Sequence, residues 1–135
     1  MNIVVDSNIV FTALLNPTAK IGQMLIYGQK QFSFFAPQLL KEEIKKHKAK
    51  IISLSEGLDE FAFEEVRDEI FNCIQFISEE QIPFHLWHDA IPLVRDTDMD
   101  DIAFVVLSNY LDARLWTGDK KLIAGLSSHG YKRLI

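Results

Sequence analysis

The chain opens with Ile3-Val4-Val5-Asp6-Ser7-Asn8, where three aliphatic residues run directly into three helix-capping side chains. A short aliphatic run of this kind, bounded by turn formers, is typical of a buried strand. The apolar-rich stretch from Ile9 to Leu15 follows at once and predicts a helix that these polar residues can cap. The opening therefore predicts a strand, a tight turn and a helix, with Asp6 at the carboxyl end of the strand.

The same alternation of strand and helix continues along the rest of the chain. Further strands are predicted at residues 32–36, 74–77, 113–117 and 131–135. Further helices are predicted at about residues 21–28, 37–52 (with Pro37 at the N-terminus), 58–73, 87–94, 102–111 and 120–126. Parallel strands need crossover connections, which these helices supply. We therefore predict an α/β fold in which a central, mainly parallel sheet carries helices on both faces.

Length and composition describe one globular domain spanning residues 1–135. Hydrophobic residues make up 48% of the chain and charged residues 24%, which excludes the disordered, collagen-like and coiled-coil classes. The longest purely apolar run, Ile102 to Leu107, is far shorter than the roughly 20 residues that span a bilayer, so no membrane span is expected. Cys73 is the only cysteine, which favours a reducing, cytoplasmic location.

The net charge of −5 excludes a protein that coats nucleic acid through a uniformly basic surface. Residues 56–69 hold seven acidic side chains and one basic one, a net charge of −6, so the remaining chain carries +1. One segment therefore carries the acidity. Such a segment is usually a solvated helix face, and the alternative is a docking surface for a basic partner.

Acidic residues follow two of the predicted strands directly. Asp6 follows Ile3-Val4-Val5, and Asp119 follows Leu115-Trp116-Thr117-Gly118. The carboxyl ends of parallel strands meet at one edge of a sheet, where the sites of α/β proteins form, so both carboxylates are expected in one crevice. Taken singly, Asp6 can equally be a helix cap and Asp119 a turn residue.

Two predicted helices bring further carboxylates. At 100° per residue, Glu43 lies about 60° from the buried position Leu40, whereas Glu42 lies about 160° away and points to water. Asp98 and Asp101 are three residues apart at the start of an apolar helix, where the helix dipole favours anions. Taken singly, such residues are more often salt-bridge partners or helix caps.

Carboxylates from these four segments would repel one another if they converged. One or two hard divalent cations remove that repulsion and prefer oxygen ligands. A divalent ion in such a site activates water for phosphodiester hydrolysis, so no protein nucleophile is required. The predicted set is Asp6, Glu43, Asp98, Asp101 and Asp119.

The same residues carry a resemblance to a known family, the PIN-domain nucleases, over nearly the whole chain. Four motifs occur in the family's order, and together at this spacing they are specific although each is weak alone. They are Val4-Val5-Asp6-Ser7-Asn8, Pro37 to Ile44 with Glu43 before an aliphatic residue, Asp98 to Val105, and Leu115 to Lys120. The resemblance implies the PIN-like three-layer α/β/α fold and a Mg²⁺- or Mn²⁺-dependent endoribonuclease, often the VapC-like toxin of a toxin–antitoxin pair.

By this resemblance, the catalytic and metal-binding residues are Asp6, Glu43, Asp101 and Asp119. Asp98 also matches the third motif, and we favour Asp101 as the primary ligand with Asp98 as an auxiliary one. The family further implies frequent homodimers, an RNA substrate and an antitoxin protein as partner. The alternatives are a catalytically silent PIN scaffold that binds nucleic acid or a protein, and a phosphatase of small phosphoesters. The phosphatase is disfavoured because the first strand carries no phosphate-binding loop or Asp nucleophile motif.

Polar residues beside the motifs have weaker predicted roles. Asn8 and Thr117 are expected to orient ligands or waters through hydrogen bonds, and a cap or turn role is equally compatible. The lysine-rich stretch that contains Glu43 is usually a solvated helix face. Here we expect Lys45, Lys46 and Lys50 to bind the RNA backbone beside the site.

Overall fold

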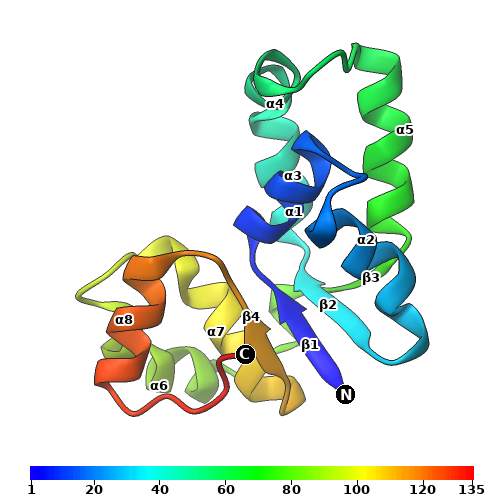
Figure 1. Ribbon diagram of the computed structural model, residues 1–135. Coiled ribbons are helices and arrows are strands. Elements are labelled where there is room, and N and C mark those ends of the chain that lie inside the picture. The colour runs from blue at the N-terminus through cyan, green and yellow to red at the C-terminus, as the bar shows by residue number, and fades with distance from the viewer.

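The computed structural model describes residues 1–135 and places a sheet between two groups of helices (Figure 1). Every neighbouring pair of strands in the sheet is parallel. The strands are β1 (Asn2–Val5), β2 (Ser33–Pro37), β3 (Ile74–Ile77) and β4 (Arg114–Trp116), in the spatial order β3-β2-β1-β4. The predicted α/β fold with a central parallel sheet is confirmed.

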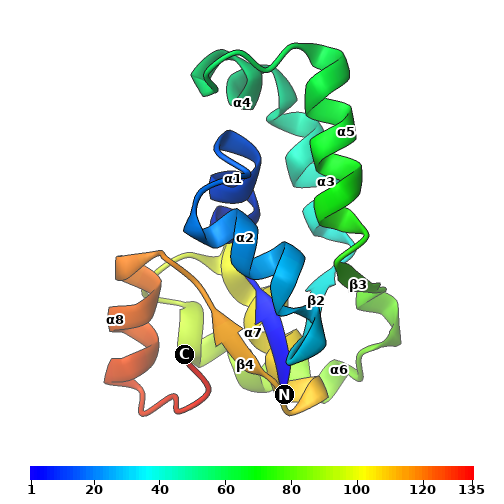
Figure 2. The ribbon, with the colours of Figure 1, turned by 45° about the vertical axis from the view of Figure 1, so that its right-hand side comes forward.

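Helices connect the strands and cover both faces of the sheet. One group consists of α1 (Ser7–Leu15), α2 (Lys20–Tyr27), α3 (Leu39–Lys46), α4 (Lys48–Leu54) and α5 (Glu60–Phe71). The other consists of α6 (Phe84–Val94), α7 (Ile102–Leu111) and α8 (Lys120–Ser128). Single 3-10 turns occur at η1 (Gly28–Lys30), η2 (Glu79–Gln81) and η3 (Met99–Asp101). Figure 2 shows α4 and one end of α5 projecting beyond the carboxyl ends of the strands.

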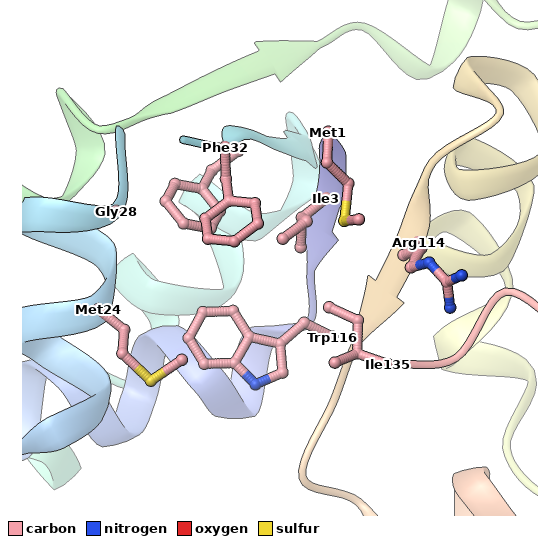
Figure 3. A pocket seen from close by; sticks show the side chains of 9 residues that line it. Met1, Ile3, Met24, Gly28, Phe32, Arg114, Trp116 and Ile135 are labelled. Carbon is pink, nitrogen blue, oxygen red and sulfur yellow. The ribbon is translucent and has the colours of Figure 1, made fainter. Parts of the chain in front are cut away.

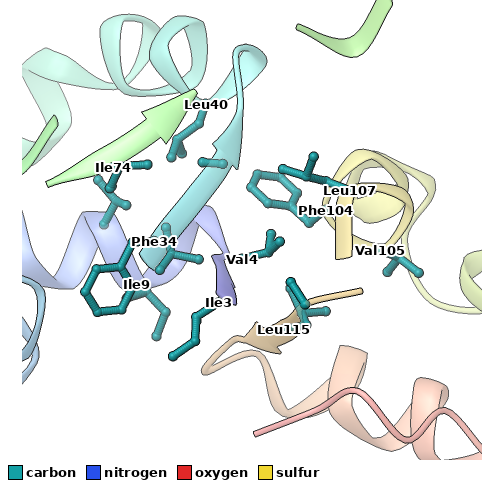
Figure 4. Close-up of a cluster of buried hydrophobic side chains, with 14 of the residues drawn as sticks. Ile3, Val4, Ile9, Phe34, Leu40, Ile74, Phe104, Val105, Leu107 and Leu115 are labelled. Atoms are coloured by element: carbon teal, nitrogen blue, oxygen red, sulfur yellow. The ribbon is translucent and has the colours of Figure 1, made fainter. Parts of the chain in front are cut away.

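The two faces of the sheet bury alternate residues of each strand. Val4 and its strand partner Leu115 point toward α7, where Phe104 lies against them (Figure 4). Ile3 and Phe34 point to the opposite face and toward α1. Six consecutive residues of α7 are buried, as expected for the helix that was predicted to be apolar nearly all round. The core therefore lies on both sides of a sheet whose strands are only three to five residues long.

The predicted continuous helix over residues 37–52 is wrong in two places. Pro37 ends β2 instead of starting a helix, because it still pairs in register with Ile77 of β3, and the N–H of Gln38 donates to the Ile77 carbonyl (3.0 Å). Proline lacks an N–H, and here no neighbouring strand requires one. The helix then breaks at His47, whose ring packs against Phe11 of α1 with centroids 5.6 Å apart. The break allows α4 to bury Ile51 and to bring Lys48 to α5.

The predicted final strand over residues 131–135 is also wrong. Only Leu134 forms a bridge, in parallel with Leu115, and the segment does not become a fifth strand. Gly130 has φ +73°, and the Tyr131 hydroxyl hydrogen-bonds to Ser108 and Asn109 of α7. These contacts anchor the segment to α7, so only one residue reaches the sheet in register.

No single helix is long and apolar enough to cross a bilayer, in agreement with the sequence-based expectation. Two consecutive helical segments, Ser7–Leu15 and Lys20–Lys30, are together long and apolar enough for a membrane span, but they are bent by 109° relative to each other. Both helices of this pair contribute buried residues to the core of the domain.

Candidate carboxylate site

Asp6 lies at the carboxyl end of β1, and both of its side-chain oxygens are fixed by neighbours. It is buried, with 2% of its surface exposed. The Thr117 hydroxyl donates to Oδ2 (2.6 Å), and the Ser7 N–H donates to Oδ1 (2.8 Å), so that Asp6 also caps α1. The Asp6 N–H donates to the carbonyl of Trp116 (2.9 Å). These bonds join the β1–α1 turn to the loop after β4.

Thr117 and Asn8 hold that loop in place. Oγ1 of Thr117 accepts a hydrogen bond from the N–H of Asp119 (3.1 Å), and Oδ1 of Asn8 accepts one from the N–H of Gly118 (3.2 Å). Thr117 therefore orients Asp6 directly. Asn8 supports the loop backbone and donates no hydrogen bond to a carboxylate.

Asp119 is the N-cap of α8, the helix that follows β4. Its Oδ1 accepts hydrogen bonds from the N–H groups of Lys121 (3.0 Å) and Leu122 (3.2 Å). Oδ2 accepts no hydrogen bond from the protein, so one oxygen of this half-buried carboxylate is free to bind a ligand. Capping and ligand binding are therefore compatible at this residue.

Glu43 reaches the same site from α3. It is half-buried, whereas its neighbour Glu42 is exposed, as the helical geometry predicted. Burial raises the pKa of Glu43, and the negative charges of Asp6 and Asp100 act in the same direction. A hydrogen-bonding contact with the Ser7 side chain lowers the pKa in part. The structure thus brings Glu43 close to the carboxyl end of β1.

Asp101 carries the carboxyl group whose pKa is raised by all four of the other predicted site residues. It is the last residue of η3 and occupies the N-cap position of α7, and it is half-buried. Burial, and after it the negative charges of Asp6, Asp98, Asp119 and Glu43, together raise its pKa from 3.8 to about 7. Residues that are far apart in the sequence therefore lie within electrostatic range of one carboxyl group.

No cationic side chain forms an ion pair with this cluster, and the one positive charge that acts on it is Lys46, which lowers the pKa of Glu43 in part. The ion pairs of the protein all lie elsewhere, and they are Lys48 with Glu60 and Glu64, Arg67 with Asp68, His88 with Asp89, and Arg133 with Asp112. A set of oxygen donors with unbalanced negative charge fits a hard divalent cation. No three His, Cys, Asp or Glu side chains are grouped tightly enough to hold an ion between them in this conformation.

Comparison with known proteins places this arrangement in a family. The family profile described as "PIN domain" matches residues 4–134. The chain belongs to the PIN-domain family. Members of this family are typically nucleases and generally bind divalent metals. No curated protein sequence matches this PIN domain.

Two solved structures share the fold of this PIN domain. One is VapBC2 from Rickettsia felis bound to a DNA fragment from their promoter, with a TM-score of 0.72, 12% identity, and 92% coverage of each chain. The other is PAE2754 from Pyrobaculum aerophilum, with a TM-score of 0.63, 12% identity, and coverage of 96% of this chain and 86% of that one. At this identity, the likeness concerns the fold alone.

Sequence reasoning missed two residues of the PIN-domain site. Ser7 was considered only as a helix cap, yet its side chain contacts both Asp6 and Glu43. Asp100 is not among the five predicted carboxylates, yet its charge raises the pKa of Glu43. Both residues lie within the motifs, Ser7 in the first and Asp100 in the third. Asp98 is exposed, and its Oδ1 accepts a hydrogen bond from the N–H of Asp100 (2.9 Å).

The lysines of α3 and α4 fall into two groups. Lys48 binds Glu60 and Glu64 of α5, and Lys41 lies 4.5 Å from the centroid of the Phe76 ring. The three lysines for which RNA contacts were predicted form no ion pair and are exposed, and these are Lys45, Lys46 and Lys50. They are therefore available to an anionic ligand.

The raised pKa of Asp101 predicts how stability changes with pH when no divalent metal is present. Below pH 3.8, the carboxyl is protonated in both the folded and unfolded states. Between pH 3.8 and about 7, the folded protein holds the proton more tightly, so stability falls as pH rises. After allowance for partial exposure, this loss is about 1–2 kcal/mol and is complete near pH 8.

Thermal melts in EDTA from pH 4.5 to pH 8 measure this effect. We expect Asp101→Asn to remove about 1–2 kcal/mol of the fall in stability that wild type shows, because a neutral amide does not titrate. Asp96→Asn, at an exposed position, is the matched control and should keep the wild-type slope. Equal slopes for wild type and Asp101→Asn would show that Asp101 is an ordinary surface carboxylate.

Proposed function

We propose that this PIN domain is a divalent-metal-dependent endoribonuclease that hydrolyses RNA phosphodiester bonds. The observation that carries the proposal is the uncompensated negative charge around Asp101, whose pKa is raised to about 7 by burial and by carboxylates from four other positions. Such a site is costly for a folded protein unless a cation binds there. Membership of a family whose members are typically nucleases supports the same chemistry.

The residues that would hold Mg²⁺ or Mn²⁺ are Asp6, Glu43, Asp101 and Asp119, with Asp98 as an auxiliary ligand. When bound, such an ion activates a water molecule and neutralises charge that develops on the scissile phosphate. Burial of Asp101, against the exposure of Asp98, favours Asp101 as the primary ligand.

The protein's own contribution is positioning. Thr117 and the Ser7 N–H hold the two oxygens of Asp6 in fixed directions, and the α8 cap leaves Oδ2 of Asp119 free. Ligands held in this way lose little freedom when a cation or a phosphate binds. Asn8 forms no hydrogen bond with a carboxylate; it accepts a hydrogen bond from the N–H of Gly118 and so holds the loop that carries Asp119.

Cleavage assays with a structured and an unstructured RNA test the proposal. We expect cleavage in Mn²⁺ or Mg²⁺ and none in EDTA, with internal cuts that are independent of free ends. An absence of cleavage in both metals, or cleavage at an equal rate in EDTA, would contradict the proposal.

A second candidate function is a catalytically silent PIN scaffold that binds nucleic acid or a protein. The observation that favours it is that no three side chains are grouped tightly enough to hold a metal. A metal titration separates the two functions, because a silent scaffold has no need to bind Mn²⁺ at micromolar concentrations. The expected result is saturable binding of Mn²⁺ by the wild type.

As biological context, we propose the toxin of a toxin–antitoxin pair. One structural neighbour, VapBC2, was solved bound to promoter DNA, which supports this setting by likeness of fold. The acidic residues of α5 that are exposed and form no ion pair, Glu65 and Glu69, suit a basic partner protein. The homodimer and the cytoplasmic location stay predictions of the sequence.

The exposed lysines predict a change in how RNA binding depends on salt. We expect replacement of Lys45, Lys46 and Lys50 by Gln to lower the slope of log K against log salt by up to about 2, since each phosphate contact contributes about 0.7. Binding is measured in an Asp6→Asn background, so that the RNA is not cut. Gln at Lys20, Lys30 and Lys132, which are exposed on other elements, is the control. An unchanged slope in the first triple variant would remove these residues from the RNA interface.

A further inference from the structure

The amino ends of the strands form an apolar cavity apart from the carboxylate site. Its volume is about 470 Å³, within the range of pockets that hold small molecules. Ile3 near the start of β1 lines it, whereas Asp6 lies beyond the other end of that strand. Figure 3 shows Met24 and Arg114 at opposite ends of the cavity, with Phe32 and Trp116 between them.

The floor of the cavity is one face of the sheet. Ile3 pairs in register with Phe34 on one side and with Arg114 on the other, so these side chains share a face. Trp116 lies two residues beyond Arg114 and therefore points the same way. This is the face away from α7, and Met24 of α2 lines the cavity from the side.

Aromatic rings make the wall rigid. The Phe34 ring lies 6.2 Å from the Phe32 ring and 6.2 Å from the Trp116 indole, centroid to centroid. Gly28 of η1 lets these rings approach the backbone, because a Cβ there would come within 3.2 Å of Phe34. The cavity is thus a continuous apolar surface of aromatic and aliphatic side chains that favours an apolar ligand.

Arg114 is the one charged side chain that lines this cavity. It forms no ion pair, and its only hydrogen bond is a long one, from Nη1 to the carbonyl of Leu134 (3.4 Å). A guanidinium offers five donors in a planar fork that matches a carboxylate. The cavity therefore combines an apolar lining with one unpaired cationic side chain at one end.

We propose that this cavity binds an amphipathic carboxylate, that is, a small molecule with an apolar chain or ring and one carboxylate group. The apolar part occupies the space between Met24, Phe32 and Trp116, and the carboxylate binds Arg114. A nucleotide does not suit the cavity, because its sugar and phosphates need several polar partners and the lining supplies one. The site is independent of the nuclease proposal, since none of the carboxylate cluster lines it.

Calorimetric titration of the whole protein with sodium decanoate, below its micelle concentration, tests the proposal. Decanol is the uncharged probe with the same chain length. We expect saturable binding of decanoate with Kd about 0.1–1 mM, and weaker binding of decanol. In a Trp87→Phe background, where Trp116 is the only indole, decanoate should also change the tryptophan fluorescence over the same concentration range.

Variants of Arg114 separate the charge from the apolar contacts. We expect Arg114→Met to weaken decanoate binding about tenfold or more while changing decanol binding by less than about twofold. Arg114→Lys keeps the charge but not the planar fork, so it should bind decanoate less tightly than wild type and more tightly than Arg114→Met. Lys30→Met is the control. It removes an exposed positive charge from η1, and Lys30 does not line the cavity.

Three results would overturn the proposal. The first is no saturable binding of decanoate up to about 5 mM. The second is an equal effect of Arg114→Met on both probes, or an effect of Lys30→Met as large as that of Arg114→Met. The third is the finding that the protein forms a dimer with Trp116 buried at its interface and that neither the dimer nor the monomer binds decanoate. That result would assign this face to a second copy of the chain.

Discussion

Asp6→Asn should lower the rate of metal-dependent RNA cleavage by about 10³-fold or more, while the protein stays folded. Asp6 is the most buried carboxylate of the cluster, and Thr117 and Ser7 hold both of its oxygens. Asn keeps the size of the side chain and the acceptor for the Ser7 N–H, but it removes the negative charge. Burial raises the pKa of Asp6, so removing the charge should leave the melting temperature in EDTA at least as high as that of wild type.

Glu42→Gln is the matched control for this experiment. It removes a carboxylate from α3 next to Glu43, at an exposed position that faces away from the cluster. Cleavage by this variant should stay within about twofold of wild type. Glu43→Gln and Asp119→Asn should behave like Asp6→Asn. Full cleavage by both Asp6→Asn and Asp119→Asn would remove the carboxylates from the mechanism.

Phe104→Ala should cost about 3–5 kcal/mol of stability. Phe104 is 1% exposed and lies between α7 and the sheet, against Val4 and Leu115 (Figure 4). Alanine leaves a cavity that the sheet and α7 cannot close, because both are fixed by their own hydrogen bonds. Since 1 kcal/mol corresponds to roughly 4 °C for a domain of this size, we expect the melting temperature to fall by about 12–20 °C.

Phe84→Ala measures the same loss of a phenyl ring at the surface. Phe84 is 81% exposed at the start of α6, and its removal should change stability by less than about 0.5 kcal/mol. Chemical denaturation with equal m-values for all three proteins makes the comparison valid. A loss of less than about 1 kcal/mol for Phe104→Ala would contradict the packing of α7 on the sheet.

Local patterns were sufficient for much of the fold. Ile3-Val4-Val5 before a capping cluster predicted β1 and α1 because both signals are contained in a few neighbouring residues. The apolar run at 102–111 predicted the most buried helix for the same reason. Helical geometry also separated half-buried Glu43 from exposed Glu42. The strand order required the structure, since pairing joins residues that are far apart in the chain.

Where the prediction failed, contacts between distant segments decided the outcome. Pro37 extends β2 because Ile77 of β3 pairs with it, and the helix breaks at His47 where α4 turns toward α5. The segment after Gly130 is held by α7 through Tyr131, which no local pattern contains. The contribution of Asp100 to the charge around Glu43 is of the same kind. The predicted set of five carboxylates rested on their joint occurrence in four motifs, and η3 folds one of these segments against the others.

Calorimetric titration of wild type and Asp6→Asn with Mn²⁺, followed by addition of RNA to the same samples, tests the central claim most directly. The account predicts saturable binding of Mn²⁺ by wild type, loss of that binding in Asp6→Asn, and RNA cleavage only in the sample that binds the metal. Wild type that binds no Mn²⁺ and leaves the RNA intact would contradict the account and leave a PIN domain that acts by binding alone.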